Sequence, residues 1–452
     1  MNNSTDSGLA TTPAEDSAFD TIEDTAWQRF YYWGKGGYIM ALEDGKFLPL
    51  PYESQVRQHL NGMGIPGRCH SEMLCKIRSH NLVQWAGPIA GIKCGLHQSE
   101  DSGQSFLVTH SPIILEAVRG RCSLIKRIMR GLFDDPNKPD QFIHVMGWLK
   151  QARTNVKNGC RRPLQALALV GPRKAGKSLF LEIARIALGG RQASAYRAIT
   201  GESGFNSQIL GAELLTIDDE VASRAPFARI CFAQAIKKVF FAPSLLLEAK
   251  GKDAFNARPV HALIIALNDE AEHIRVLPEI DHNLKDKISL IKCGRMDVSP
   301  SELRDREGFW QYILSEMPAF LYYLENFPVP EELFDERTGV KAYHSEELIS
   351  KLQEISPEQE LYELLIQNQT VRHGFAADGV WQGKAVELKA ALEADDATRH
   401  ASRHLLQRQG SLGDYLGRLA KSRRFCVSKG PQQRGIQTWR LSAPDGWVPG
   451  GK

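Results

Sequence analysis

An apolar run followed by a glycine-rich loop and an amphipathic helix constrains this chain more than any other feature. The segment is ALALVGPRKAGKSLFLEIARIAL, residues 166–188. Leu167 to Val170 are expected to form a buried strand, and Ile183 and Ile186 lie on one face of the following helix. The glycines allow backbone N–H groups to wrap around a phosphate, and the helix directs its positive N-terminal end toward the same group. The segment predicts a phosphate-binding loop (P-loop) in an α/β fold.

The residue types in this loop predict which nucleotide groups it binds. We expect Lys177 to reach the β- and γ-phosphates of ATP and the hydroxyl of Ser178 to bind Mg²⁺. The residues expected to surround the nucleotide are Gly171, Pro172, Arg173, Lys174, Ala175, Gly176, Lys177 and Ser178. ATP and Mg²⁺ are therefore the predicted cofactors, and ATP hydrolysis is the predicted reaction.

A second apolar run ends in three acidic residues. In ELLTIDDE, the run 214–217 is followed directly by Asp218, Asp219 and Glu220. P-loop enzymes need carboxylates at such a strand end to hold Mg²⁺ and to position the attacking water. If 214–217 is the whole buried run, Asp218 and Asp219 form the catalytic pair and, with Ser178, the metal site. If the strand is one residue longer, Asp219 and Glu220 form the pair.

A third apolar run, Val260 to Leu267, ends in Asn268. A polar side chain at that position can orient the attacking water between the P-loop and the acidic strand. Asn268 is therefore the third candidate catalytic group.

Together the strand ends GPRKAGKS, IDDE and Asn268 resemble the AAA+ core of superfamily-three helicases, the ring-forming replication ATPases of phages, plasmids and small viruses. The resemblance continues through LLLEAKGKDAF, RPVHALIIALN, PEIDHNLKDKISLI and EMPAFLYYLENFPVP. It is greatest to the helicase part of phage primase-polymerases, over roughly residues 85–370. The resemblance implies a homo-oligomeric ring, expected to be a hexamer, that acts on single-stranded or forked DNA and hydrolyses ATP at its subunit boundaries.

The residue that would complete the ATP site from a neighbouring subunit is left open by the sequence. Where many relatives have Asp-Arg, this chain has Asp286-Lys287. An arginine finger offers a planar, permanently charged fork to the γ-phosphate, whereas lysine is a point charge. Either Lys287 acts in trans, or Arg275 or Arg295 takes the role, or hydrolysis is slow. The sequence favours Arg275 and Lys287 equally.

Residues Leu245 to Ala266 are expected to form a hairpin with Lys250 and Lys252 at its turn. In the helicase family such hairpins line the channel of the ring and carry basic residues that hold phosphates without reading bases. Lys250 and Lys252 are therefore candidate nucleic-acid contacts. The alternative is an ordinary solvent-exposed lysine turn.

Charge is concentrated at the two ends of the chain. The first 24 residues hold six acidic residues and no lysine or arginine, which indicates a disordered acidic tail. Residues 397–452 hold eleven lysines or arginines against two aspartates, a charge of +9. Such a basic end indicates a polyanion contact, and a solvated basic face is the alternative.

The basic end is expected to be a winged-helix-like domain. The predicted helices are Trp381–Leu392 and Leu412–Leu419, and two wing strands are expected around the turn KGPQQRG. Arg423 and Arg424 would then contact duplex phosphates. The alternative is a winged helix that binds protein and is only solubilised by its charge.

The predicted domain order is a tail (1–24), a small α+β domain (25–135), the AAA+ core (138–300), a helical lid (301–370) and the winged-helix-like domain (371–445). The longest apolar runs are far too short for a membrane helix, and no secretory signal is visible, so neither a membrane partner nor export is expected. The eight scattered cysteines suit reduced thiols in a cytoplasm.

A zinc site is not expected from the cysteines and histidines near the N-terminus, because no pair of cysteines among them has C-x2-C spacing. These residues are Cys69, His70, Cys75, His80, Cys94 and His97.

The sequence therefore predicts an ATP-dependent DNA helicase or translocase of phage or mobile-element replication, with priming supplied by a separate primase or polymerase. A non-helicase AAA+ machine, such as a nucleic-acid-sensing defence or remodelling ATPase, is the main alternative. A switch-type NTPase without motor function is another.

Overall fold

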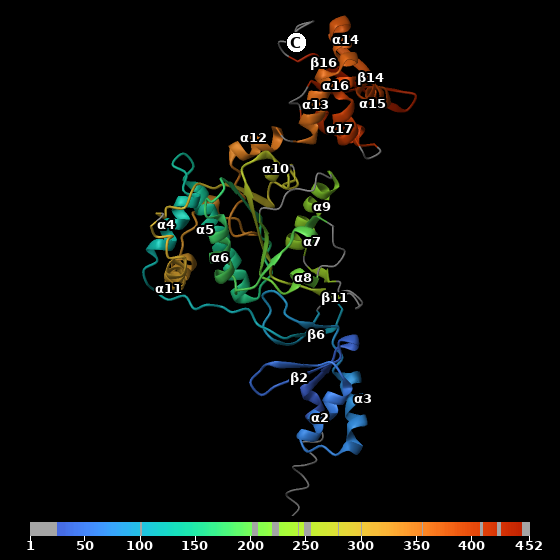
Figure 1. Cartoon of the computed structure of the whole chain (residues 1–452). Helices are drawn as coiled ribbons and strands as arrows, with labels where there is room; N and C mark the ends of the chain where they lie inside the picture. Colours follow the sequence, from blue (N-terminus) through green and yellow to red (C-terminus); the bar gives the residue numbers. More distant parts are fainter. Residues whose placement is uncertain are drawn as a thin grey trace, which may run out of the picture. The chain divides into compact units, whose positions relative to one another are not determined.

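The computed structural model of the chain describes residues 25–99, 102–200, 207–218, 226–242, 244–247, 255–278, 280–299, 301–354, 356–406, 410–422 and 426–444 (Figure 1). The chain divides into two compact units. The first combines Met1–Asn268 with His282–Tyr343, and the second combines Asp269–Asp281 with His344–Lys452.

A parallel five-stranded sheet forms the centre of the first unit. Its order is β13-β7-β12-β9-β8. The strands are β7 (Ala166–Gly171), β8 (Gln192–Ser194), β9 (Leu214–Asp218), β12 (Ala262–Asn268) and β13 (Ile288–Lys292). The inner strands are buried along nearly their whole length, as apolar runs covered on both faces require.

Helices cover both faces of this sheet (Figure 1). On one side lie α4 (Ser123–Phe133), α5 (Asp140–Asn158), α6 (Lys177–Ala187) and α11 (Arg306–Glu325), which share one hydrophobic core with β7 and β12. On the other side lie α7 (Tyr196–Thr200), α8 (Ser207–Leu210) and α9 (Pro226–Ile236), followed by the π-helix η4 (Lys237–Phe241). The stretch 134–139 separates α4 from α5.

Two buried polar contacts hold the first of these helix layers together. Glu316 on α11 accepts hydrogen bonds from the backbone nitrogens of Leu124 (3.2 Å) and Ile125 (2.9 Å), and so caps the N-terminus of α4. Arg153 on α5 is almost fully buried and pairs with Glu325 at 2.8 Å. Both contacts satisfy groups that burial would otherwise penalise.

Two small sheets precede the central one. The first is antiparallel and packs with two helices around its own core; its elements are β1 (Phe30–Tyr32), β2 (Tyr38–Ala41), β3 (Phe47–Leu50), α2 (Glu53–Gly62) and α3 (His70–His80). The second consists of β4 (Trp85–Gly87), β5 (Gly95–Gln98) and β6 (Ser105–Val108). Short 3-10 turns are η1 (Trp27–Arg29), η2 (Gly34–Gly36), η3 (Gly67–Cys69) and η5 (Glu331–Leu333).

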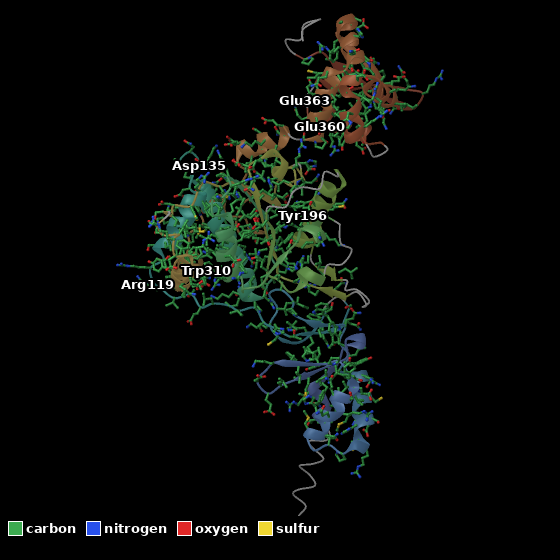
Figure 2. All side chains as sticks on the ribbon, in the orientation of Figure 1. Arg119, Asp135, Tyr196, Trp310, Glu360 and Glu363 are labelled. Atoms are coloured by element: carbon green, nitrogen blue, oxygen red, sulfur yellow. The ribbon has the colours of Figure 1, made fainter. Side chains whose placement is uncertain are left out.

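An extended stretch, residues 109–122, connects β6 to α4 without forming a helix or strand. Its backbone is held at two points, by Ile113 N donating to Gly189 O (3.1 Å) and Val118 N donating to Pro318 O (3.0 Å). The side chain of Arg119 in this stretch extends outward, whereas Trp310 packs against the core (Figure 2).

The second unit has a separate core. Its elements are α10 (Ala271–Ile274), α12 (Glu346–Glu354), α13 (Pro357–Gln367), α14 (Gln369–Asp378), β14 (Val380–Lys384), α15 (Ala385–Ala394), α16 (Asp396–Leu405), α17 (Ser411–Ser422), β15 (Val427–Gln433) and β16 (Ile436–Ser442). The strands form an antiparallel sheet of order β14-β16-β15. Glu360 and Glu363 lie on α13 (Figure 2), whose leucines belong to this core.

The second unit differs in detail from the sequence interpretation. The expected helix Trp381–Leu392 is a strand up to Lys384 and a helix only from Ala385, because Trp381 pairs with Leu441 on β16 and packs in the core. The residues of the expected lid, 301–370, are divided: α11 belongs to the first unit, and α13 packs in the second. None of the described helices has the length and apolar character that crossing a bilayer requires.

Candidate functional site

The P-loop joins the end of β7 to the start of α6, as the sequence predicts. Both motif glycines are required by close neighbours: a Cβ atom at Gly171 would lie 2.6 Å from the carbonyl oxygen of Cys293, and one at Gly176 would lie 2.9 Å from Sδ of Met296. Gly176 also has a φ of +110°, a backbone conformation that residues other than glycine rarely adopt. Lys174 adopts a left-handed φ of 58°. The loop conformation therefore depends on these glycines.

Lys177 is the first residue of α6 and is buried, with 6% of its surface exposed. Its Nζ atom donates to the carbonyl oxygens of Gly171 (2.9 Å) and Pro172 (2.9 Å) and to Oδ1 of Asn268 (3.1 Å). An ammonium group has three protons, so these acceptors satisfy all of them. The lysine is thus held inside the loop that it is expected to serve.

Ser178 and Asp218 face each other across the loop. The Oγ atom of Ser178 lies 3.4 Å from Oδ2 of Asp218. Residues 214–217 of β9 are buried and Asp218, its last residue, is exposed. The buried run is thus 214–217, whereas the strand extends one residue further to Asp218, so the Asp218–Asp219 pair and the Asp219–Glu220 pair both stay open. Asp219 and Glu220 lie outside the described residues.

Asn268 ends β12, the strand that lies between β7 and β9. In this sheet Asn268 pairs with Gly171 on one side, and Ala266 pairs with Asp218 on the other. The carboxyl ends of three adjacent parallel strands therefore bring together a lysine, an amide and a carboxylate.

The remaining loop residues differ in exposure. Pro172 is half-buried, the side chains of Arg173 and Lys174 are exposed, and Ala175 is buried. The carbonyl oxygen of Ala175 accepts a hydrogen bond of 2.8 Å from Met296 N.

The segment from Cys293 to Met296 packs against the P-loop at Gly171 and Gly176, and no sequence pattern predicts this contact. Cys293 N donates to Val170 O at 2.7 Å, so the segment continues the β13–β7 pairing beneath the P-loop. Burial raises the pKa of the Cys293 thiol to about 12, and the charge of Lys177 only partly opposes this. The thiol therefore stays protonated and acts as a packing group.

The three candidates for a trans-acting residue have different positions. Lys287 precedes β13, whose strand pairs in parallel with β7, so Lys287 lies at the opposite end of the strands from the P-loop, roughly 16 Å away at about 3.3 Å per residue. Its Nζ atom is 2.6 Å from Asp286 and 5.4 Å from the ring centroid of Phe241. Arg295 is exposed beside the P-loop of its own subunit, and Arg275 follows α10 in the second unit.

The expected hairpin is present at its base. β10 (Leu245–Leu247) pairs antiparallel with β11 (Phe255–Ala257), so the returning strand is β11 and not the longer β12. Lys250 and Lys252 lie outside the described residues.

Arg161 anchors the base of this hairpin. Its guanidinium donates to the carbonyl oxygens of Val239 (2.6 Å), Pro259 (3.0 Å) and Ala242 (3.2 Å). Burial, and then the charge of Arg258, lower the pKa of Arg161 to about 10, so it remains charged at neutral pH.

Exposed basic side chains of the second unit lie on α17 and on the β15–β16 hairpin. Arg434 lies in the turn of this hairpin and has a left-handed φ of 50°. Arg418 is engaged by Glu358 at 2.9 Å. Lys421 and Lys429 are exposed. Arg423 and Arg424 lie outside the described residues.

The cysteines and histidines near the N-terminus are dispersed. His70 is buried, and its Nε2 atom is 3.0 Å from Ile65 O, whereas Cys75 and Cys94 are exposed. Within the described residues no group of three or more His, Cys, Asp or Glu side chains is placed to hold a metal ion.

Comparison with known proteins places the fold. Residues 169–283, which include the P-loop and β12, match a family described only as a "Family of unknown function (DUF5906)". No curated protein matches the chain.

Solved structures resemble the chain over nearly its whole length. The A-form apo structure of the NrS-1 C-terminal region has a TM-score of 0.51 and 12% identity, and covers 94% of this chain and 99% of that one. A second apo structure of the same region has a TM-score of 0.51 and 14% identity, with 94% and 98% covered. A JCV helicase with a bound small molecule is more distant, with a TM-score of 0.26, 11% identity and 56% of this chain covered. The chain therefore shares its fold with the NrS-1 C-terminal region.

Proposed function

We propose that this chain is an ATP-dependent DNA helicase or translocase with an AAA+ core, a member of the superfamily-three branch that acts in phage or mobile-element replication. The observation that carries the proposal is the hydrogen bond of 3.1 Å between Lys177 and Asn268 beside the Ser178–Asp218 pair. A buried cation, an amide and a carboxylate at adjacent strand ends are the groups that phosphoryl transfer to water needs.

The residues of the loop fit ATP and Mg²⁺. Mg²⁺ prefers oxygen ligands, and the hydroxyl of Ser178 and the carboxylate of Asp218 lie close enough to share one ion. Lys177, now bound to loop carbonyls, would exchange those acceptors for phosphate oxygens. The bound ion supplies charge neutralisation at the phosphates. Asn268 would orient the attacking water, and Asp219 or Glu220 would accept its proton.

We propose assembly into a ring, expected to be hexameric, and the position of Lys287 supports this proposal. Because it lies at the far end of the strands from its own P-loop, Lys287 can serve only the site of a neighbour. Its contact with Asp286 reduces the charge it could offer, which favours Arg275 for the trans role. In either case the ATPase rate per subunit should rise with protein concentration or on adding DNA. Full activity in a strictly monomeric protein, by light scattering with an ATP analogue and DNA, would contradict this.

DNA is the proposed substrate because of the hairpin and the basic residues of 397–452. The fold shared with the NrS-1 C-terminal region is compatible with this proposal. Lys250 and Lys252 would contact the phosphates of a single strand, and the exposed cations of α17 and β15–β16, with Arg423 and Arg424, would contact duplex. Priming would come from a separate primase or polymerase.

The deciding experiment measures phosphate release with and without single-stranded DNA. The wild type should hydrolyse ATP faster with DNA, and Lys177→Ala should lose hydrolysis, because the lysine charge is aimed at the transferred phosphate. Lys46→Ala, an exposed lysine in the β2–β3 turn, is the matched control. Full ATPase activity in Lys177→Ala would end the P-loop hypothesis.

A double variant separates a motor from an ATPase of another kind. Lys250→Ala with Lys252→Ala should keep basal hydrolysis but lose stimulation by DNA and strand separation. Wild-type unwinding by this double variant, or complete indifference of the wild-type ATPase to DNA, would favour the alternative of a non-helicase AAA+ machine.

A further inference from the structure

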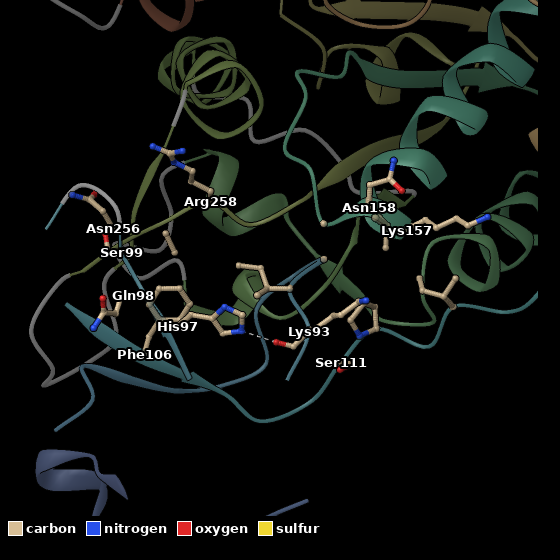
Figure 3. Close-up of a pocket in the computed structure, with 17 residues that line it drawn as sticks. Lys93, His97, Gln98, Ser99, Phe106, Ser111, Lys157, Asn158, Asn256 and Arg258 are labelled. Atoms are coloured by element: carbon tan, nitrogen blue, oxygen red, sulfur yellow. Dashed lines mark hydrogen bonds between the residues drawn. The ribbon is translucent and has the colours of Figure 1, made fainter. Parts of the chain in front are cut away.

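A cavity of about 760 Å³ lies in the first unit, away from the P-loop (Figure 3). Its walls come from residues within 91–99, Phe106, residues within 111–114, the end of α5 at 156–159, and residues 256–258 at the end of the hairpin. The stretches 156–159 and 256–258 precede β7 and β12, so the cavity lies at the amino ends of the parallel strands. The P-loop lies at their carboxyl ends, roughly 20 Å away for strands of this length. This cavity is therefore a separate site.

The described side chains that line the cavity include basic and amide groups and no acid. The basic groups are Lys93, Lys157 and Arg258, and the amides are Gln98, Asn158 and Asn256. Lys157 also contacts Glu325, at 3.1 Å, which lies outside the lining. Lys93, Lys157 and Arg258 are all exposed to solvent. The lining thus favours an anion that also carries hydrogen-bonding groups.

An aromatic pair forms part of the wall. The rings of His97 and Phe106 are stacked, with centroids 5.5 Å apart and planes 14° from parallel. Phe106 is buried, and a hydrogen bond of 2.8 Å between Nε2 of His97 and the carbonyl oxygen of Lys93 holds the imidazole in place. Figure 3 shows this bond and places Lys157 and Asn158 across the cavity from His97. A ring fixed in this way is a platform for another flat ring.

Two glycines give the cavity a backbone wall. Gly91 has a φ of +71°, and a Cβ atom there would lie 2.5 Å from Val260, so only glycine fits. Gly159 ends α5 with a φ of +59°, and a Cβ atom there would lie 3.2 Å from Gly91 O. Side chains are thus excluded where the two loops meet. Gly91 N donates to Oε1 of Glu213 at 2.9 Å and Gly159 N donates to Val156 O at 3.2 Å, so the two glycines shape the wall while their N–H groups are already bonded.

We propose that this cavity binds one nucleotide unit of single-stranded nucleic acid, with the base stacked on His97 and the phosphate among Lys93, Lys157 and Arg258. The volume lies within the range of about 300–1,000 Å³ usual for small-molecule sites, which a nucleotide fits. Asn256 and Ala257 belong both to the lining and to β11, so a strand that follows the hairpin would pass this site. The cavity chemistry would suit a free nucleotide equally well. The inference rests on the proposed function for one point, that the bound nucleotide belongs to a single strand of nucleic acid.

Binding without ATP tests the proposal separately from the motor. The probe is a fluorescein-labelled oligothymidylate of about 15 nucleotides, and the readout is its fluorescence anisotropy with the full chain. His97→Ala should weaken binding by roughly 5- to 100-fold, the range for loss of one stacked base. Lys93→Ala should weaken binding and reduce the salt slope by about 0.7, the value for one phosphate contact on a single strand. His97→Phe should keep most of the affinity.

The controls separate stacking from folding. Lys46→Ala removes an exposed lysine outside the cavity and should bind like the wild type. Basal ATPase activity without DNA should be unchanged in all variants, since the site is far from the P-loop. If His97→Phe binds as weakly as His97→Ala, stacking is not the role of the ring and the proposal is wrong.

A second experiment identifies the source of the nucleotide by competition between unlabelled thymidine monophosphate and the labelled oligonucleotide. Thymidine monophosphate should displace the oligonucleotide only at concentrations far above that of the oligonucleotide. Displacement at equal concentration, lost in His97→Ala, would assign the cavity to a free nucleotide. Wild-type affinity in both the His97→Ala and Lys93→Ala variants would overturn the cavity as a nucleotide site. DNA-stimulated hydrolysis that persists in that case would leave the proposed function standing.

Discussion

The Nζ atom of Lys177 and the Oδ1 atom of Asn268 are hydrogen-bonded at 3.1 Å, across the adjacent ends of β7 and β12. The first residue of the P-loop helix and the last residue of a strand 91 positions further along the chain are thus direct partners. The amide accepts one of the three hydrogen bonds that Lys177 Nζ donates. Asn268 ends β12, the strand between β7 and β9.

Replacement of this amide should affect turnover more than binding. Asn268→Ala is expected to bind an ATP analogue within a few-fold of the wild type but to hydrolyse ATP about 100-fold more slowly, the usual effect of removing one aligned polar group. Phosphate release and analogue binding measure the two effects. Asn326→Ala, an exposed asparagine at the end of α11, is the control. Equal losses of binding and turnover would show that Asn268 has only a structural role.

The Ser178–Asp218 pair should govern the requirement for Mg²⁺. Ser178→Ala and Asp218→Asn are each expected to raise the Mg²⁺ concentration for half-maximal hydrolysis by about 10-fold or more, because each removes an oxygen at the ion. Asp219→Asn should instead permit ATP binding and stop turnover. The measurement is ATPase rate against Mg²⁺ concentration. An unchanged Mg²⁺ dependence in Asp218→Asn would move the metal site to Asp219 and Glu220.

Glu316 should be important for stability and not for chemistry. Glu316→Ala leaves the backbone N–H groups of Leu124 and Ile125 buried without their acceptor, which should destabilise the fold by about 2–4 kcal/mol. Urea unfolding followed by circular dichroism measures the change. Glu307→Ala, in the exposed first turn of the same helix, should cost less than about 0.5 kcal/mol. Similar effects of both substitutions would contradict the capping role.

His261 should make the first unit sensitive to mild acid. Its Nδ1 atom donates to Ala212 O at 2.8 Å, Nε2 has no partner within the described structure, and burial lowers the pKa to about 4. Since this folded value is below the unfolded value of about 6.5, the unfolded chain binds the proton first. The stabilisation is complete above about pH 6.5 and is lost as the pH falls toward 4, by up to about 3 kcal/mol.

Urea unfolding at several pH values tests this slope. His261→Gln keeps a donor for Ala212 O but cannot be protonated, so its stability should fall less steeply between about pH 6.5 and 4.5. The burial that lowers the pKa of His144 acts in the same direction and should remain in this variant. His282→Gln, at an exposed site, is the control. An identical slope in wild type and His261→Gln would rule out the buried imidazole as its source.

The local elements around the P-loop were predictable because they depend on residues close in sequence. The run 166–171 is a buried strand, the loop closes at Gly176, and the helix begins at Lys177. In α5 the side chains at the helical spacing i, i+3, i+4 and i+7 are all buried, namely Phe142, Val145, Met146 and Leu149. Apolar spacing and glycine position are properties of a short segment, so they can be read without knowing its neighbours.

Predictions failed where a residue's partner is distant in sequence. Trp381 has helical spacing with the residues that follow it, but it pairs with Leu441 in a sheet, and that contact determines its conformation. The return strand of the hairpin is β11, because β12 is engaged on both sides in the central sheet. Tertiary contacts in these cases outweigh local preference.

Local sequence specifies the order of strand, loop and helix at residues 166–188 and the polar groups at three strand ends. Long-range contacts place β12 between β7 and β9, pack Cys293 to Met296 against the loop, and put Lys287 at the far end of the sheet from its own P-loop. They also bring residues 91–99, 156–159 and 256–258 together around one cavity. An apolar pattern specifies that a strand is buried. Any buried parallel strand can form the same backbone hydrogen bonds with a neighbour, so the pattern does not specify which strands lie side by side.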